Sequence, residues 1–166
     1  MNAKRISGVG TTLFLAFLIM VTPVFAAANP HFGKVNPSGP DDEGSLTVDF
    51  SAGGIYYPPL GVNVSATRDT IFACKPPVGD FPPNPYQQEV IDTVQGGTVA
   101  RCVNSCRGSI TIPPPVTSLT CEGSMIPTLA MIIYSDLNIY GIFGDFQVLQ
   151  KKINGTYSAT YYGYTP

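Results

Sequence analysis

Four cysteines are the residues with the clearest chemical potential: Cys74, Cys102, Cys106 and Cys121. An even number of cysteines predicts two disulfides if the chain is exported, and three pairings are possible. We favour Cys102–Cys106, because a hairpin over residues 98–112 with a three-residue loop would place them opposite each other. The second bridge would then be Cys74–Cys121. Zinc binding by the Cys-x3-Cys unit is the rival interpretation, but a suitably spaced second pair is missing, so no metal site is expected.

Catalytic and calcium-binding motifs are weak. His31 is the only histidine, so a nucleophilic triad would have to use it, yet no G-x-S-x-G motif accompanies any serine. The acidic cluster Asp41-Asp42-Glu43 could offer oxygen ligands to calcium, but it lacks the alternating spacing of calcium loops. We therefore interpret His31 as structural or surface-exposed, and the acidic cluster as a solvated turn after Pro40.

Paired carboxylates are the remaining route to hydrolysis. The candidates are Glu89, Asp92, Glu122, Asp136 and Asp145. A glycosidase needs two carboxyl groups about 5 to 9.5 Å apart across a groove, and sequence does not define that separation. Asp136 alternates with Tyr134 and Asn138, which predicts an ordinary exposed strand face. A carboxylate-dependent hydrolase is therefore the alternative to a non-enzymatic protein that needs no cofactor.

Tyrosine is the most suggestive residue type, with nine copies and no tryptophan. The candidate binding surface consists of Tyr56, Tyr57, Tyr161, Tyr162 and Tyr164. Tyrosine rings stack on sugars and provide amphipathic contact area at protein interfaces. Neighbouring residues of a strand point to opposite faces, so about half of these rings are expected to pack inward. The predicted partner is a cell-surface glycan or an extracellular protein.

The first 28 residues resemble a secretory signal peptide. Lys4 and Arg5 precede the apolar run of residues 13–21, and small residues allow cleavage after Ala26 or Ala28. The run is shorter than the ~20 residues that span a bilayer, and no later segment is long enough, so no membrane span is expected after cleavage. We expect a secreted, extracellular protein, or a periplasmic one if the producing cell has two membranes.

The composition of the remaining chain excludes one class of partner. Seven basic and eleven acidic residues lie beyond Ala28, which gives a net charge of −4. The basic residues are scattered, whereas nucleic-acid binding needs a basic face that neutralises phosphates. We therefore expect no nucleic-acid partner. Low charge also suits a self-associating structural matrix protein, which is a further alternative.

Short alternating segments predict an all-β fold. Apolar and polar residues alternate over residues 46–50 and 62–67, and the strongest apolar stretch covers residues 128–143. Proline-rich runs at 58–60, 75–85 and 112–116 predict loops or edge segments between the strands. We expect residues 29–166 to form a single antiparallel β-sandwich of immunoglobulin-like type, with Pro/Gly-rich loops and two disulfides.

Several short motifs carry a family resemblance. They include Asn29-Pro30-His31-Phe32, Phe72-Ala73-Cys74, Leu119-Thr120-Cys121-Glu122-Gly123 and Tyr134-Ser135-Asp136-Leu137. In this order they resemble a family of small secreted microbial β proteins of unknown function whose mature chain begins NPHF. The resemblance implies a secreted β fold and a Cys74–Cys121 bridge, with Cys102 and Cys106 as an addition. It implies no activity.

Overall fold

The computed structural model describes residues 29–55 and 59–166. The predicted signal peptide, Tyr56 and Tyr57 lie outside the described residues. The described part is all-β, with eight strands in two antiparallel sheets. The short sheet has the order β1-β2-β5, with β1 (His31–Ser38), β2 (Leu46–Ile55) and β5 (Asn104–Ile112). The long sheet has the order β4-β3-β6-β7, with β4 (Gln87–Ala100), β3 (Leu60–Lys75), β6 (Ile126–Phe143) and β7 (Phe146–Lys152), while β8 (Tyr157–Thr160) pairs with β6.

The two sheets pack face to face as a β-sandwich, and alternation in the sequence explains which side chains lie between them. Leu46, Val48 and Phe50 on β2 are buried, and so are Val62 and Val64 on β3. The polar residues between them point outward, because successive side chains of a strand face opposite sides of the sheet. The predicted sandwich is thus confirmed at the level of two packed antiparallel sheets.

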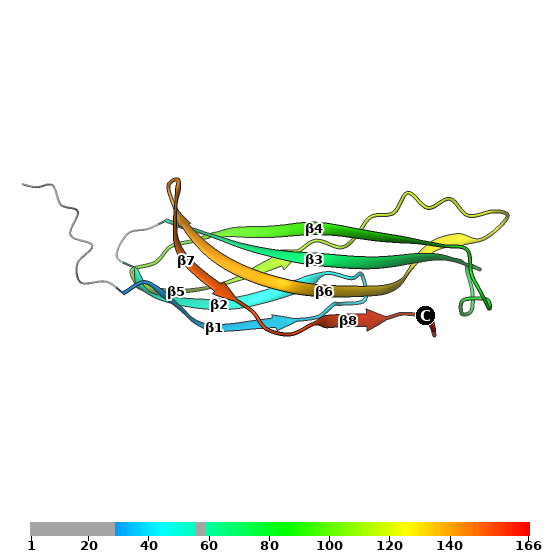
Figure 1. Cartoon of the computed structure of the whole chain (residues 1–166), viewed down its shortest axis with the longest axis horizontal. Helices are drawn as coiled ribbons and strands as arrows, with labels where there is room; N and C mark the ends of the chain where they lie inside the picture. Colours follow the sequence, from blue (N-terminus) through cyan, green and yellow to red (C-terminus); the bar gives the residue numbers. More distant parts are fainter. Residues whose placement is uncertain (1–28, 56–58) are drawn as a thin grey trace, which may run out of the picture.

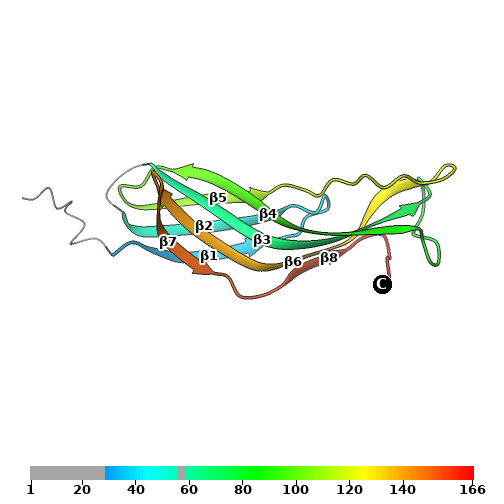
Figure 2. The same cartoon turned by 45° about the horizontal axis from the view of Figure 1, so that its top comes forward.

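The long sheet extends well beyond the short one (Figures 1 and 2). β3 has 16 residues and β6 has 18, whereas β2 has 10 and β5 has 9. The molecule therefore has two different ends. We call the tip formed by residues 76–86, 113–125 and 161–166 the extended end. The opposite tip, with loop 101–103 and the β6–β7 turn, is the hairpin end.

The predicted hairpin over residues 98–112 is wrong, although its disulfide is right. β4 pairs with β3 and β5 pairs with β2, so the chain crosses from one sheet to the other after Ala100. A Cys102–Cys106 bond closes this crossing, and Asn104 adopts a φ of 72° there. Gly96 lets β4 approach β5 closely, because a Cβ at this position would lie 2.7 Å from the backbone oxygen of Thr111.

A bulge in β6 overturns the predicted exposed face around Asp136. The pairing of β3 with β6 shifts between Ser65 and Thr67, and Asp136 has a φ of 50°. The extra residue shifts the alternation by one position, so that Tyr134 before the bulge and Leu137 after it are both fully buried in the same core. Asp136 itself is exposed, and its carboxylate lies 3.6 Å from the ammonium of Lys152.

Candidate binding surfaces

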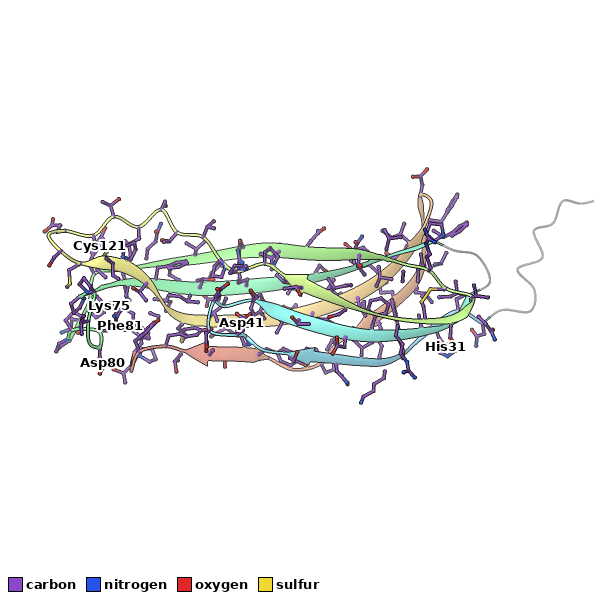
Figure 3. All side chains as sticks on the ribbon, turned by 180° about the vertical axis from the view of Figure 1, so that it is seen from behind. His31, Asp41, Lys75, Asp80, Phe81 and Cys121 are labelled. Carbon is purple, nitrogen blue, oxygen red and sulfur yellow. A yellow bond between two sulfur atoms is a disulfide. The ribbon has the colours of Figure 1, made fainter. Side chains whose placement is uncertain are left out.

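The extended end is built from proline-rich segments that a disulfide ties to the long sheet. Cys74, at the end of β3, is bonded to Cys121, as predicted. The backbone N–H of Cys74 also donates to the oxygen of Tyr86, which closes the loop between β3 and β4. Prolines restrict the backbone of these segments, so the end is held in shape without further strands. Figure 3 shows Cys121 beside Lys75 and Phe81 at this tip.

A small second core stiffens the outer side of the extended end. Tyr164, near the C-terminus, is 8% exposed and packs with Ala73 and Ala130. The ring of Phe81 meets that of Tyr164 edge to face at 5.7 Å between centroids. The Tyr164 hydroxyl donates to Oε1 of Gln87 at 2.7 Å. The C-terminal segment is thereby fixed to the outer face of the long sheet.

Lys75 is buried in this small core next to the most exposed tyrosine of the C-terminal segment. Lys75 is only 5% exposed, and its ammonium donates to the backbone oxygen of Pro76 at 3.0 Å. The same ammonium lies 4.8 Å from the ring centroid of Tyr162, a cation–π contact. Tyr162 is 54% exposed and also meets Phe81 edge to face. Its ring is thus held in place while much of it faces solvent.

Only part of the predicted tyrosine surface lies where a partner could reach it. Tyr162 is exposed, but Tyr164 is buried, and Tyr161 is half-buried against the main core. The Tyr161 hydroxyl donates to the backbone oxygen of Asp41 at 2.6 Å. Tyr161 and Tyr164 therefore act as internal anchors, and Tyr162 is the member of the predicted surface that is largely exposed among the described residues. Tyr56 and Tyr57 lie outside the described residues.

A buried polar cluster at the middle of the molecule was missed at the level of sequence. Arg68 on β3 forms a bidentate ion pair with Asp92 on β4. Nε of Arg68 donates to Oδ1 of Asp92 at 3.0 Å, and Nη2 donates to Oδ2 at 2.8 Å. Its other terminal nitrogen donates to the backbone oxygen of Pro113. The neighbouring Tyr134 donates to the oxygen of Gly44 at 2.7 Å. The signal was present in the alternation, because Arg68 continues the inward series of Val62 and Val64.

Burial and charge shift the ionisation of this cluster. Burial alone would lower the pKa of the Arg68 guanidinium, but its contacts with Asp92 and Tyr134 outweigh it and raise that pKa. Burial raises the pKa of the Tyr134 phenol, although the charge of Arg68 opposes the effect. Burial and the nearby carboxylate of Asp41 raise the pKa of Tyr161. Both phenols are therefore neutral donors over a wide pH range.

The raised pKa values of Tyr134 and Tyr161 predict that the folded protein loses stability in alkaline solution. The folded state holds the protons of Tyr134 and Tyr161 more tightly than the unfolded state, whose tyrosines titrate near pH 10. The free energy of unfolding should therefore be level below about pH 9 and fall as the pH rises past about 10. Urea unfolding followed across this range measures the effect. The fall should be shallower in Tyr134→Phe, and a stability that rises above pH 10 would contradict the assignment.

The residues most suited to nucleophilic catalysis are committed to other contacts. His31 lines a shallow depression of about 510 Å³ on the short sheet, together with Ser51 and Arg107. Its Nδ1 lies 2.8 Å from the backbone oxygen of Asn29. Ser51 Oγ accepts from the N–H of Lys34 and donates to its carbonyl oxygen. Neither side chain is arranged as a base or a nucleophile toward the other.

The acidic side chains are dispersed along the molecule. Asp41 uses Oδ1 to accept the backbone N–H groups of Glu43 and Ser45, so its cluster caps the turn between β1 and β2. Asp92 is engaged with Arg68, and Asp145 lies in the turn at the other end. Among the described residues, no three His, Cys, Asp or Glu side chains gather as a metal site would require.

Comparisons with known proteins add no assignment. No protein-family model, curated protein or solved structure matches the chain. Within residues 29–55 and 59–166, no helix has the length and apolar character needed to cross a membrane.

Proposed function

We propose that the chain is an exported, non-enzymatic binding protein whose contact surface is the extended end. The observation that carries the proposal is Tyr162, an exposed ring fixed between Lys75 and Phe81 on a disulfide-tied tip. A ring that is already immobilised loses little conformational entropy when a partner binds. Such a ring can stack on the face of a sugar. We assign the ligand to the insoluble glycans of a cell surface or matrix, with an extracellular protein as the other outcome.

Export is supported by two independent features of the chain. The first 28 residues have the charge, apolar run and small residues of a signal peptide. Both disulfides suit an oxidising compartment, such as the extracellular space or a periplasm. The resemblance to secreted proteins that begin NPHF agrees with this compartment.

An immunoglobulin-like sandwich is the finer fold class that we propose. The sheets β1-β2-β5 and β4-β3-β6-β7 have the strand order of an ABE sheet facing a C′CFG sheet. The bridge from Cys74 to Cys121 joins the end of β3 to the segment before β6, rather than the two sheets at the centre of the core. Domains of this architecture commonly bind through their loop-bearing ends, which supports placing the contact surface at a tip.

A non-enzymatic role fits the arrangement of the chemically capable groups. His31 and Ser51 are held by backbone contacts, and Asp92 is neutralised by Arg68. A carboxylate-dependent hydrolase would need two carboxylates facing one groove. The candidates instead occupy the β6–β7 turn, the β6 bulge, β4 and the segment before β6. No observation favours this second function over binding.

The proposal predicts that Tyr162→Ala weakens adsorption to insoluble polysaccharide. Loss of one stacked ring should raise the dissociation constant about tenfold, which corresponds to about 1.4 kcal/mol. The assay is co-sedimentation of protein purified after expression of the full chain, over a panel of insoluble glycans. Tyr140→Ala is the matched control, because Tyr140 is a half-buried tyrosine of β6 in the half near the hairpin end.

The two variants separate the possible outcomes. If Tyr162→Ala alone loses binding, the extended end is the glycan surface. If both variants bind as the unaltered protein does, this surface is not the site. If the unaltered protein binds no glycan but pellets with protease-sensitive material of the cell envelope, the partner is a protein.

A further inference from the structure

Exposed apolar side chains gather at the two ends of the molecule. Eleven large apolar side chains of the described residues are exposed. Five lie in the extended end or, in the case of Ile126, directly after it at the start of β6: Val78, Tyr86, Val116, Ile126 and Tyr162. Five belong to the hairpin end: Val99, Val103, Phe143, Phe146 and Val148. Only Ile91, on β4, lies between them. Clustered exposed apolar side chains mark contact surfaces, so this elongated molecule has one at each tip.

The hairpin end projects its apolar side chains on a tight turn. Gly144 and Asp145 connect β6 to β7, and Gly144 has a φ of 57° at the first turn position. Phe146 follows the turn directly and is 75% exposed. Val103, in the crossing beside the Cys102–Cys106 bond, is 79% exposed. Val103 thus lies in a short connection, and Phe146 lies directly after one.

Charge differs in sign between the two halves. We divide the described residues at the level of Thr67 on β3, with the hairpin end on one side and the extended end on the other. The hairpin half has five basic and three acidic residues, a net charge of +2. Its members are Lys34, Arg101, Arg107, Lys151, Lys152, Asp49, Asp136 and Asp145.

The extended half is anionic, and its accessible charges are carboxylates. It has two basic and eight acidic residues, a net charge of −6. Both basic residues are buried: Arg68 is 8% exposed and paired with Asp92, and Lys75 is 5% exposed inside the small core. The acidic turn at Asp41 lies in this half, because the backbone oxygen of Asp41 accepts from the Tyr161 hydroxyl and that of Gly44 from the Tyr134 hydroxyl. Asp80 in the loop after β3 and Glu122 beside the disulfide lie in it as well. Figure 3 shows Asp80 and Cys121 at the opposite tip from His31.

We propose that copies of this protein associate head to tail, with the hairpin end of one copy binding the extended end of the next. Apolar contact would supply most of the free energy, and the opposite charges would set the orientation. Two hairpin ends or two extended ends would bring like charges together. An interface between two different patches does not close on itself unless the rotation forms a ring, so the expected product is a filament. The inference does not depend on glycan binding.

Two variants with one disabled end each provide a specific test. Phe146→Ser alters the hairpin end, and Val78→Ser alters the extended end; both side chains are exposed, so folding should be unaffected. Protein purified after expression of the full chain is followed by sedimentation velocity without glycan. The unaltered protein should form species that grow with concentration, and added salt should reduce them. Each variant alone should be monomeric.

The decisive sample is an equal mixture of the two variants. Each contributes one intact end, so the mixture should form dimers and nothing longer. A strict monomer for the unaltered protein at its highest soluble concentration would overturn the proposal. So would a closed dimer that only one of the two substitutions dissociates, because this would indicate a symmetric interface. Melting temperatures of both variants, measured by circular dichroism, exclude unfolding as the cause.

Discussion

Replacing Cys74 and Cys121 together by serine is expected to lower the free energy of unfolding by about 4 kcal/mol. The bond closes a separation of 47 residues, which restricts the unfolded chain strongly. In the folded state it also joins the proline-rich segment before β6 to the end of β3, where the short sheet gives no cover. The loss should therefore be accompanied by early proteolysis between residues 113 and 125.

The second disulfide provides the matched control for this prediction. Cys102 and Cys106 are separated by only 4 residues, so their replacement by serine should lower the free energy of unfolding by about 2 kcal/mol. Urea unfolding of the oxidised proteins measures both values. Equal losses in the two double variants, or unchanged proteolysis of the extended end, would show that Cys74–Cys121 does not hold this end in place.

Replacing Asp92 by alanine is expected to lower the free energy of unfolding by about 3 kcal/mol. The substitution leaves the Arg68 guanidinium buried without a carboxylate partner, with only the backbone oxygen of Pro113 and the neutral phenol of Tyr134 beside it. This loss of unfolding free energy lies at the lower end of the range for breaking a buried ion pair, because the Asp92 side chain is 37% exposed. Urea unfolding at neutral pH is the measurement.

A double variant separates the unpaired charge from the loss of the contact. Arg68→Met/Asp92→Ala removes the buried cation and keeps an unbranched side chain in its place, so it should be more stable than Asp92→Ala alone. A double variant less stable than Asp92→Ala would contradict this explanation. It would indicate that Arg68 stabilises the cluster through Pro113 and Tyr134 rather than through its partner on β4.

The strands and disulfides were largely predictable because they follow from local rules. Alternation at Leu46, Val48 and Phe50 gives the buried face of β2 directly. The predicted bonds Cys102–Cys106 and Cys74–Cys121 are both present. The alternation predicted over residues 62–67 covers only part of the 16-residue strand β3, because Arg68 and Asp69 interrupt the apolar pattern in sequence but not in space.

The features that escaped prediction depend on which strands become neighbours. The bulge at Asp136 reverses the facing of β6, and nothing in the local alternation indicates an unpaired residue. Arg68 is buried because Asp92 lies opposite it on β4, a pairing that appears only with the register of the long sheet. The contrast between the two ends also depends on topology, since the residues of each end come from several distant parts of the sequence.

The most direct test of the central claim is the binding isotherm of the unaltered, oxidised protein on envelopes of the cells that produce it. The protein is purified after expression of the full chain, mixed with washed envelopes and sedimented, and the fraction in the pellet is measured against concentration. The account predicts saturable binding that a large excess of unlabelled protein displaces. Protein that stays in the supernatant at every concentration would contradict a surface-binding function.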